Sequence, residues 1–380
     1  MRSFTSPAAR AAGPLLFAPV TFALLALGFS QSFAENEGDE VYSLPPIVVV
    51  ADLAETPADQ VGSSVTTITR EEIERSQKNS VLDLLREVPG LDVVRSGGPG
   101  GQTSVFMRGG ASEHTLVLVD GVEMNDPSSP NGAYDFAGLS AENIERIEIL
   151  RGAQSALYGS DAIGGVISFI TREATGDQRP SFAAEVGGFN TYRASAGFSS
   201  SSARVSYTLN VSRFATKGIS ATSASGQAPV ERDGFGRSAV SGRLRYSLSP
   251  QVTARLSLRA FESTAELDKS FASFSSGVRE DPNLTADTRQ AFLSSSVEYE
   301  SPDRRWRLTG YATVSRHERE TVDLPDNVFG PDASNSFFDG EQVKFRLLAR
   351  GQVFPSHRIV AGVETERELT SQHLLGPFPA

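Results

Sequence analysis

The residue types that most often carry out catalysis are few and scattered in this chain of 380 residues, which contains no cysteine. His317 precedes Glu318, but the second histidine of a zinc-protease helix is missing. The pairs Gly109-Gly110 and Gly164-Gly165 lack the spacing of a dinucleotide-binding loop, and no phosphate loop occurs. The four histidines are His114, His317, His357 and His373. We therefore expect a protein that is not an enzyme and requires no cofactor.

Acidic side chains in two long polar segments are the one pattern that could hold a metal ion. Glu231 and Asp233 lie in the first segment, and Glu280 and Asp281 lie in the second. Carboxylate oxygens are ligands that suit Ca²⁺. The alternative is that these side chains are simply hydrated. Calcium is thus the one ion that we consider.

Composition narrows the class of protein. A net charge of -11 argues against binding to nucleic acid, which requires a basic surface. The only long apolar run covers residues 14–29, which is short for a membrane-spanning helix, and it follows Arg2 and Arg10. Ser32 and Ala34 offer small residues for cleavage, so residues 1–34 are predicted to be a signal peptide rather than a retained anchor. The exported chain would then begin near Glu35.

Residues 143–172 predict two strands around a glycine-rich turn and a short helix. Apolar and polar residues alternate in residues 144–150 and 165–171, as expected for strands. Glycine has no Cβ atom, so it allows sharp turns and close approach of the backbone to a neighbour. We expect that role at four positions: Gly152, Gly159, Gly164 and Gly165.

The segment before this unit predicts further small elements. Thr69 and Glu72 form a capping box that begins one helix, and Ser80 caps a second helix, which Pro89-Gly90 ends. The apolar face of the second helix contains Val81, Leu82, Leu84, Leu85 and Val88. Strands are predicted at residues 65–69, 91–94, 105–108 and 116–120, loops at 96–101 and 125–138, and a tight turn at Asp120-Gly121. We expect Tyr134 and Phe136 to be exposed in the second loop.

After residue 175 the pattern changes to long strands with one apolar face and one face rich in arginine. Alternation alone would also suit a soluble sandwich, but segments of about 10 residues can cross a bilayer when tilted. Short and long links alternate: residues 217–237, 266–287 and 323–342 are long, and 249–251, 301–304 and 355–356 are short. A transmembrane barrel has this asymmetry, whereas a sandwich does not require it. We count about nine strands up to Thr370.

The run ERIEILRGAQSALYGSDAIGGVISFITR, residues 145–172, resembles the end of the plug domain of TonB-dependent outer-membrane receptors. Gly121 in LVLVDGV and Arg108-Gly109 in VFMRGG match the same family, and the resemblance extends over residues 44–172. The outer-membrane cobalamin transporters are the subfamily that it resembles most. Ala153 replaces the usual proline and Phe169 a frequent asparagine, and both are conformational or packing positions.

The resemblance implies an α+β plug domain followed by antiparallel transmembrane β-barrel strands. The expected organisation is a signal peptide at 1–34, a periplasmic linker at 35–60, a plug at 61–175 and part of the barrel at 176–380. The family's barrel has 22 strands, so about nine strands cannot close around a plug. We therefore expect the N-terminal part of a receptor, either a fragment or a truncated product.

The resemblance also implies site residues. Five of them form the expected TonB box, the short strand offered to the partner protein TonB: Ile47, Val48, Val49, Val50 and Ala51. We expect this strand to lack a hairpin partner, and the alternative is an edge strand of the plug. Ligand contacts are expected in two outward-facing loops, although these residues could equally be hydrated loop tips: Gly98, Pro99, Gln102, Asn125, Asp126, Ser128, Ser129, Asn131 and Tyr134.

A structural role is implied for a third group of residues, in preference to a relay for substrate. Its members are Arg108, Gly109, Asp120, Gly121, Arg146, Arg151, Gly152, Tyr158, Gly159, Gly164 and Gly165. We expect Arg108, Arg146 and Arg151, with Glu145 and Glu148, to join the plug to arginine-lined barrel strands, because buried charges must be paired.

The implied function is energy-coupled uptake across the outer membrane, in contact with lipid and lipopolysaccharide and without nucleic acid. The work would come from the inner-membrane proton gradient through TonB. Cobalamin is the ligand that we expect, and a ferric siderophore or haem is the alternative within the family. A passive porin or adhesin barrel and a secreted β-sandwich are the alternatives from other classes. The resemblance also makes calcium in the long loops a candidate, because cobalamin transporters order such loops with this ion.

Overall fold

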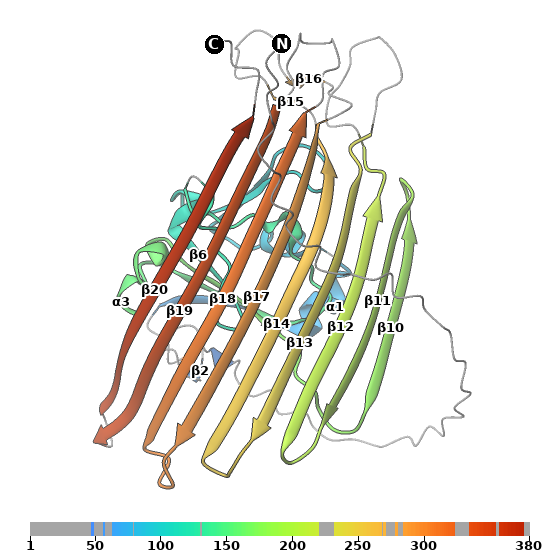
Figure 1. The fold of residues 1–380 in the computed structure, drawn as a ribbon. Helices are drawn as coiled ribbons and strands as arrows, with labels where there is room; N and C mark the ends of the chain where they lie inside the picture. The colour runs from blue at the N-terminus through green and yellow to red at the C-terminus, as the bar shows by residue number, and fades with distance from the viewer. Residues whose placement is uncertain are drawn as a thin grey trace, which may run out of the picture. The chain divides into compact units, whose positions relative to one another are not determined.

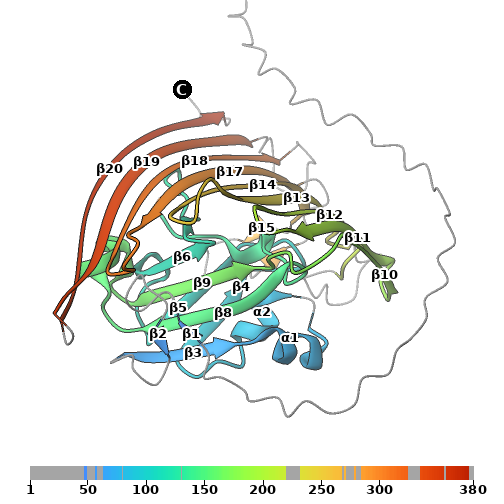
Figure 2. The same cartoon turned by 90° about the horizontal axis from the view of Figure 1, so that it is seen from below.

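A small α/β domain lies against the concave face of a long, curved antiparallel sheet (Figures 1 and 2). The computed structural model describes residues 47–48, 56–57, 63–78, 80–129, 131–219, 232–267, 269–270, 278–279, 284–323, 334–354 and 357–375. All of them belong to one unit, Pro45–Ala380. The predicted signal peptide and most of the predicted linker lie outside these residues.

The main sheet of the α/β domain has five strands in the order β3-β8-β9-β6-β7. Strands β6 and β9 run parallel and the other neighbours antiparallel. The bounds are β3 Ser64–Ile68, β6 Thr115–Val119, β7 Val122–Glu123, β8 Ile144–Arg151 and β9 Gly165–Thr171. A separate hairpin joins β4 (Leu91–Arg95) to β5 (Thr103–Met107). The predicted strands of this domain are thus present, with ends shifted by one or two residues.

Three short helices complete the domain: α1 (Arg70–Ser76), α2 (Val81–Leu85) and α3 (Ser155–Tyr158). The predicted capping box is confirmed, because the Thr69 hydroxyl accepts from the Glu72 N–H and the Glu72 carboxylate accepts from the Thr69 N–H. Ser80 caps α2 as predicted. Single 3₁₀ turns occur at Ser112–His114 (η2), Phe136–Gly138 (η3) and Ser160–Ala162 (η4). No helix among the described residues is long and apolar enough to cross a bilayer.

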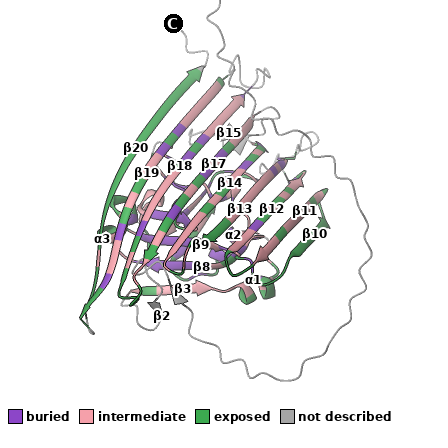
Figure 3. Ribbon diagram, turned by 60° about the horizontal axis from the view of Figure 1, so that its bottom comes forward, coloured by how far each residue is buried: buried purple, intermediate pink, exposed green. Residues whose placement is uncertain are grey.

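The core of the domain lies between the main sheet and helix α2. The predicted apolar face of α2 is buried, with Val81 and Leu85 fully inaccessible. These residues form one cluster with Ile147, Ile149 and Phe169 of the main sheet. Figure 3 shows the same result as buried residues concentrated in β8 and β9. Phe292, which belongs to the large sheet, also joins this cluster, so the two layers share apolar contact.

Nine strands form the large sheet, which we call the wall, in the order β10-β11-β12-β13-β14-β17-β18-β19-β20. Each strand pairs antiparallel with its neighbour. The bounds are β10 Arg179–Gly187, β11 Thr191–Ser201, β12 Val205–Thr216, β13 Phe235–Ser247, β14 Val252–Glu266, β17 Thr285–Glu300, β18 Trp306–Asp323, β19 Ser334–Phe354 and β20 His357–Leu375. The predicted number of strands is confirmed.

The links between wall strands are short at one end and, after the first hairpin, long at the other. Residues 202–204, 248–251, 301–305 and 355–356 form the short end, and residues 217–234, 267–284 and 324–333 form the long links. The predicted alternation is therefore confirmed. One long link contains a two-residue hairpin that the sequence did not predict, β15 (Lys269–Ser270) with β16 (Val278–Arg279).

The two faces of the wall have opposite chemistry. Leu209 is 51% exposed on the outer face, whereas its neighbour Thr208 is 7% exposed on the inner face. Phe345 and Gln342 show the same contrast on β19. A water-soluble sandwich buries its apolar face, but here that face is exposed and the polar face covers the α/β domain. Apolar-out, polar-in alternation is the pattern of a transmembrane barrel strand.

Two residues of the predicted TonB box fall within the described structure, and they are paired. β1 (Ile47–Val48) lies antiparallel to β2 (Thr56–Pro57). The expectation of a strand without a hairpin partner is therefore wrong for Ile47 and Val48, because they pair with Pro57 and Thr56. Their two-residue sheet is separate from the five-stranded sheet, so they are not an edge strand of the α/β domain. The remaining box residues, Val49, Val50 and Ala51, lie outside the described residues.

Candidate functional site

The first predicted ligand loop, residues 96–102, is the tip of the β4–β5 hairpin. The Ser96 N–H donates to the Gln102 carbonyl at 2.9 Å and closes the loop. It packs against the start of β13, because a Cβ atom added to Gly98 would lie 2.9 Å from Asp233 and one on Gly100 would lie 2.3 Å from Phe235. The loop therefore lies where the long link 217–234 meets the wall. Gln102 is exposed, Pro99 is half-buried and Gly98 is buried.

The second predicted ligand loop is held by buried polar side chains. The Asn125 side-chain oxygen accepts from the Val117 N–H at 3.0 Å, and its amide donates to the Gly132 carbonyl at 3.2 Å. The Asp126 carboxylate accepts from the Ser128 N–H at 2.8 Å and hydroxyl at 2.7 Å. Asn125, Asp126 and Ser128 are all buried. These three residues shape the loop and do not present their side chains to the outside.

Tyr134 and Phe136 are buried, contrary to the expectation that they are exposed. Tyr134 is 3% exposed and Phe136 is 2% exposed. Their rings meet edge to face at 4.9 Å, and Phe136 lies beside Phe169 in the core. Asp135 between them accepts from the N–H groups of Thr103 and Ala137. Burial raises the pKa of both Tyr134 and Asp135. This part of the loop thus closes the core and ties it to the β4–β5 hairpin.

The exposed members of the second loop form a small polar group. Asn131 is exposed and Ser129 is half-buried. The Ser129 hydroxyl donates to the Asn131 side chain at 3.1 Å, and the Asn131 amide donates to Glu113 at 3.2 Å. Of the nine residues predicted to contact ligand, Gln102, Asn131, Pro99 and Ser129 are thus the accessible ones in this conformation.

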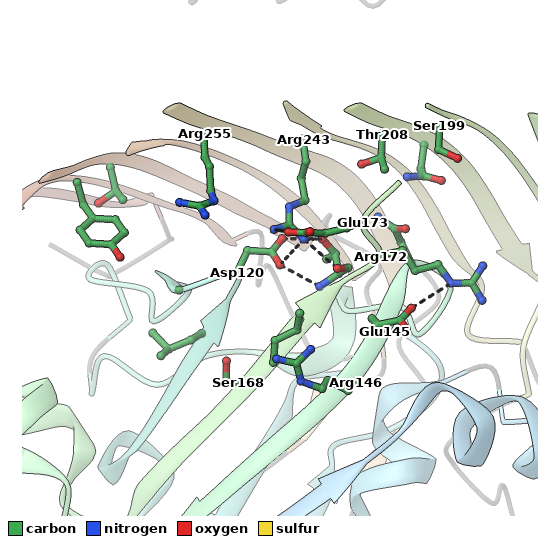
Figure 4. Close-up of a pocket in the computed structure, with 18 of the residues that line it drawn as sticks. Asp120, Glu145, Arg146, Ser168, Arg172, Glu173, Ser199, Thr208, Arg243 and Arg255 are labelled. Atoms are coloured by element: carbon green, nitrogen blue, oxygen red, sulfur yellow. Dashed lines mark hydrogen bonds and ion pairs between the residues drawn. The ribbon is translucent and has the colours of Figure 1, made fainter. Parts of the chain in front are cut away.

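Charged groups join the turn between β6 and β7 to β13 of the wall (Figure 4). Arg243 lies 3.3 Å from the Asp120 carboxylate, donates to the Thr171 carbonyl at 2.8 Å and pairs with Glu173 at 2.9 Å. Asp120 also accepts from the N–H and hydroxyl of Thr171. Asp120 and Gly121 both have positive φ, at 52° and 80°, so the predicted tight turn is present.

A second ionic contact lies on the other side of the same turn. Lys344 of β19 pairs with Glu123, and its ammonium lies 3.1 Å from Glu366. Both partners of the first pair are nearly buried, with side-chain exposures of 11% and 12%. Burial raises the pKa of Glu123, and the ammonium of Lys344 opposes that shift. The β6–β7 hairpin is thus attached to two wall strands that lie far apart in the sheet.

The remaining contacts are distributed along the wall. Arg193 pairs with Glu142 at 3.0 Å, Arg237 donates to the Gly138 carbonyl at 3.0 Å, and Arg319 lies 3.8 Å from Asp126. Sequence analysis missed these residues as individual contacts. The alternation of apolar and polar residues along each strand could have indicated them, because it places each of these arginines on the inner, polar face. Their partners could not be assigned, since they depend on where the α/β domain lies along the wall.

Most of the charged residues expected to join the domain to the wall have partners inside the domain instead. Arg146 pairs with the fully buried Glu148 at 2.7 Å. Arg151 donates to the Thr66 hydroxyl of the adjacent strand at 2.8 Å, and Glu145 lies 3.9 Å from Arg172. Arg108 is exposed, with a φ of 51°. The expectation of contact with the described wall strands is therefore wrong for Arg146, Arg151 and Glu145, whose partners belong to the domain. For Arg108 and Glu148 it stays a prediction.

The predicted glycine positions do require glycine or favour it. Gly152, Gly159 and Gly165 have φ values of 111°, 85° and 147°. A Cβ atom on Gly164 would lie 2.9 Å from the His114 carbonyl oxygen. Gly109 also has positive φ, at 73°. Tyr158 is half-buried and packs against the cluster around Leu150 and Val166.

A cavity of about 870 Å³ separates part of the domain from the wall. Its floor comes from the strands of the main sheet and its roof from the inner face of the wall (Figure 4). Charged side chains from both layers line it, including Arg146 and Arg172 below and Arg243 and Arg255 above. The cavity therefore offers a polar space between the α/β domain and the wall.

The calcium prediction is not tested by the described residues. Asp233 is buried beside Gly98, and Glu231, Glu280 and Asp281 lie outside the described part of the chain. Within that part, no three histidine or acidic side chains are grouped so that they could hold a metal ion. Calcium stays a prediction for the long links.

Comparison with known proteins adds independent evidence. Residues 57–166 match the family model described as the TonB-dependent Receptor Plug Domain. A vitamin B12 transporter from Photobacterium profundum is 43% identical over 148 residues, which are 39% of this chain and 23% of that protein. The chain thus matches less than a quarter of that relative's length.

Solved structures share the fold. The ferripyoverdine receptor of the Pseudomonas aeruginosa outer membrane superposes with a TM-score of 0.70 at 14% identity, over 88% of this chain and 46% of that one. The ferric yersiniabactin uptake receptor of Yersinia pestis gives 0.66 at 18%, over 83% and 50%. The present chain therefore spans about half the length of these receptors.

The fold and the interface define a plug packed against a polar-lined, lipid-compatible wall. Residues 57–166 match the TonB-dependent receptor plug domain, and the nine-stranded antiparallel sheet that follows has the fold of part of the ferripyoverdine receptor. From here on the α/β domain is called the plug.

Proposed function

We propose that this protein imports a scarce ligand across the outer membrane in a TonB-dependent manner. The observation that carries the proposal is a folded plug joined by charged contacts to the inner face of a wall whose outer face is apolar. A passive pore has no need of such a plug. Ligand would bind outside, and a pull on residues 47–51 by TonB would rearrange the plug.

The proposed attachment point suits this role. Ile47 and Val48 pair with only two residues of their own chain, outside the main plug sheet. A pairing of only two residues is easily replaced by pairing with the edge of a partner's sheet. The partner's sheet would then add this strand through backbone hydrogen bonds. The next described strand, β3, is an edge strand of the plug, so force on the linker would reach the plug there.

Cobalamin is the ligand that we propose first. The support is the 43% identity with a vitamin B12 transporter, which covers 148 residues. The solved relatives named above are receptors for ferric yersiniabactin and ferripyoverdine, and their low identities support the fold alone. An iron chelate is therefore the second candidate. Gln102 and Asn131, on the accessible parts of the two plug loops, are the proposed polar contacts for either ligand.

Equilibrium binding of cyanocobalamin to the purified natural gene product in detergent tests the choice of ligand. We expect saturable binding, weakened in the Gln102→Ala variant and unchanged in Glu87→Gln, whose exposed carboxylate lies on the helical side of the plug. A parallel titration with Ca²⁺ tests the acidic long links. Binding of a ferric siderophore and not of cyanocobalamin would transfer the assignment to iron uptake.

A further inference from the structure

A smaller cavity of about 230 Å³ adjoins the large one at the short-link end of the wall. Its arginines all lie within a few residues of a short link. Arg245 is near the end of β13 and Arg255 near the start of β14, and the link 248–251 joins these strands. Arg307 is near the start of β18 and Arg350 near the end of β19. Four strands thus place arginine at the same level of the inner face.

Positive charge exceeds negative charge in this cavity. Five arginines line it, against three carboxylates. Arg243 uses two of them, Asp120 and Glu173. Arg255 lies 3.5 Å from the third, Glu298, which is also 3.9 Å from Arg307. Arg307 pairs more closely with Glu300, at 3.0 Å, and Glu300 does not line the cavity. Within the described part of the chain, Arg245 and Arg350 have no carboxylate partner.

The strand register places like charges opposite each other. Arg245 is the direct cross-strand neighbour of Arg255, and Arg307 is that of Arg350. Like charges in this arrangement destabilise a sheet. Glu300 compensates Arg307 in the second pair, whereas Arg245 and Arg350 keep uncompensated charges that a bound anion would neutralise.

Unused hydrogen-bond donors point to the same kind of ligand. The Arg350 Nε atom and the Thr208 hydroxyl are buried without a hydrogen-bond partner in the described structure. Thr208 is 7% exposed and lines both cavities. Figure 4 shows Thr208, Arg243 and Arg255 projecting from the wall on the side of the plug. A buried polar group without a partner is costly, and a guanidinium has the planar geometry that matches carboxylate and phosphate oxygens.

We propose that this cavity, lined by Arg245, Arg255, Arg307, Arg350 and Thr208, binds an oxyanion of the phosphate or carboxylate type. The oxyanion is either free in the periplasm or a group carried by the transported ligand. In the second case the site would hold the ligand after it has passed the plug, and this role rests on the proposed transport function. Binding of the anion itself does not depend on transport.

Inorganic phosphate is the probe for the test, titrated by calorimetry into the purified natural gene product at low ionic strength. We expect saturable binding that the Arg245→Gln/Arg350→Gln variant weakens by about tenfold or more, because two charge-assisted hydrogen bonds to the anion are lost. Arg305→Gln is the matched control, because Arg305 is exposed on a short link. Absence of saturable binding, or equal weakening by the control, would overturn the proposal.

Thermal stability distinguishes an anion site from a purely structural cluster. Removal of Arg245 and Arg350 relieves like-charge contacts, so the double variant should melt no lower than the natural protein in phosphate-free buffer. Phosphate should raise the melting temperature of the natural protein and not that of the variant. A variant that is less stable without phosphate would contradict the proposal. Thr208→Val, a nearly isosteric change, should weaken phosphate binding while the fold is retained.

Measurement of ligand uptake distinguishes the two sources of the oxyanion, which are the transported ligand and free phosphate. If the ligand's own anionic group uses the cavity, the double variant should take up ligand more slowly although binding at the outer loops is unchanged. If free phosphate is the occupant, uptake should not change. The phosphate titration needs neither TonB nor transported ligand. It therefore tests anion binding even if the transport proposal is wrong.

Discussion

At the scale of single residues, burial separates structural side chains from accessible ones within the same loop. Asn125 and Gln102 have similar chemistry, and the sequence placed both in the ligand site. Asn125 is 5% exposed and satisfies three backbone groups, whereas Gln102 is exposed at the hairpin tip. The two amides therefore have different expected effects when removed.

The Asn125→Ala substitution should destabilise the plug by about 1–3 kcal/mol, because it leaves the buried Val117 N–H without an acceptor. Gln102→Ala should change stability by less than about 0.5 kcal/mol, as is usual for exposed positions. Calorimetric melting of the plug transition measures both variants. Equal destabilisation by the two substitutions would contradict the assignment of separate roles.

Asp135 predicts a pH dependence of plug stability. Burial raises its pKa above the ordinary value of about 3.9, so the folded plug binds this proton more tightly than the unfolded chain. The contribution of Asp135 to stability therefore falls as pH rises from about 4 toward its raised pKa. Asp135→Asn keeps an oxygen that can accept from Thr103 and Ala137 but cannot titrate. The melting temperature of this variant, measured over the same pH range, should lack the decline due to Asp135. The same pH dependence in the natural protein and the variant would contradict the prediction.

At the scale of elements, the β6–β7 hairpin is attached to the wall by two ionic contacts, at Asp120 and Glu123. Lys344→Met should cost about 3–5 kcal/mol, because it leaves the carboxylate of Glu123 buried without its cation. The double variant Glu123→Gln/Lys344→Met should recover most of that loss. Chemical unfolding of the three proteins closes the cycle, and additive losses would show that the pair is not coupled.

If the outer face of the wall contacts lipid, a charged residue on that face should impair assembly, whereas the same change on a soluble sheet should not. Leu209 is half-exposed on the outer face, where Leu209→Arg should cost about 2–4 kcal/mol near the middle of a bilayer. Pro250→Arg, on an exposed short link, is the control and should have little effect. The measurement is the fraction of heat-modifiable protein assembled in outer membranes. Normal assembly of Leu209→Arg would place that face in water.

Local rules explain why so much of the fold was predictable. The capping box at Thr69 and Glu72 and the alternation at Thr208 and Leu209 depend only on neighbours within three residues. Tyr134 was placed wrongly because its burial depends on contacts between distant segments. Asp135 beside it reaches the N–H of Thr103, 32 residues away. The exposure of site residues that depends on such contacts cannot be predicted from a single sequence.

At the scale of the whole molecule, the plug must move relative to the wall if ligand is to pass. The Asn143 amide lies 3.4 Å from the Ser241 hydroxyl across the interface. Since the chain has no cysteine, an Asn143→Cys/Ser241→Cys variant can form only the intended disulfide within this chain. The oxidised variant should bind ligand normally and take it up much more slowly, and reduction should restore uptake. Full uptake by the oxidised protein would show that this contact does not open.

In the proposed mechanism, TonB drives ligand uptake through the segment at residues 47–51. Uptake of labelled cyanocobalamin by cells that make the natural protein or its Val48→Pro variant tests it most directly, because proline removes a backbone donor that β-augmentation needs. We predict that the variant binds ligand at the cell surface and loses uptake, while Val48→Ile retains both. Undiminished uptake by Val48→Pro would contradict coupled transport and favour a passive barrel.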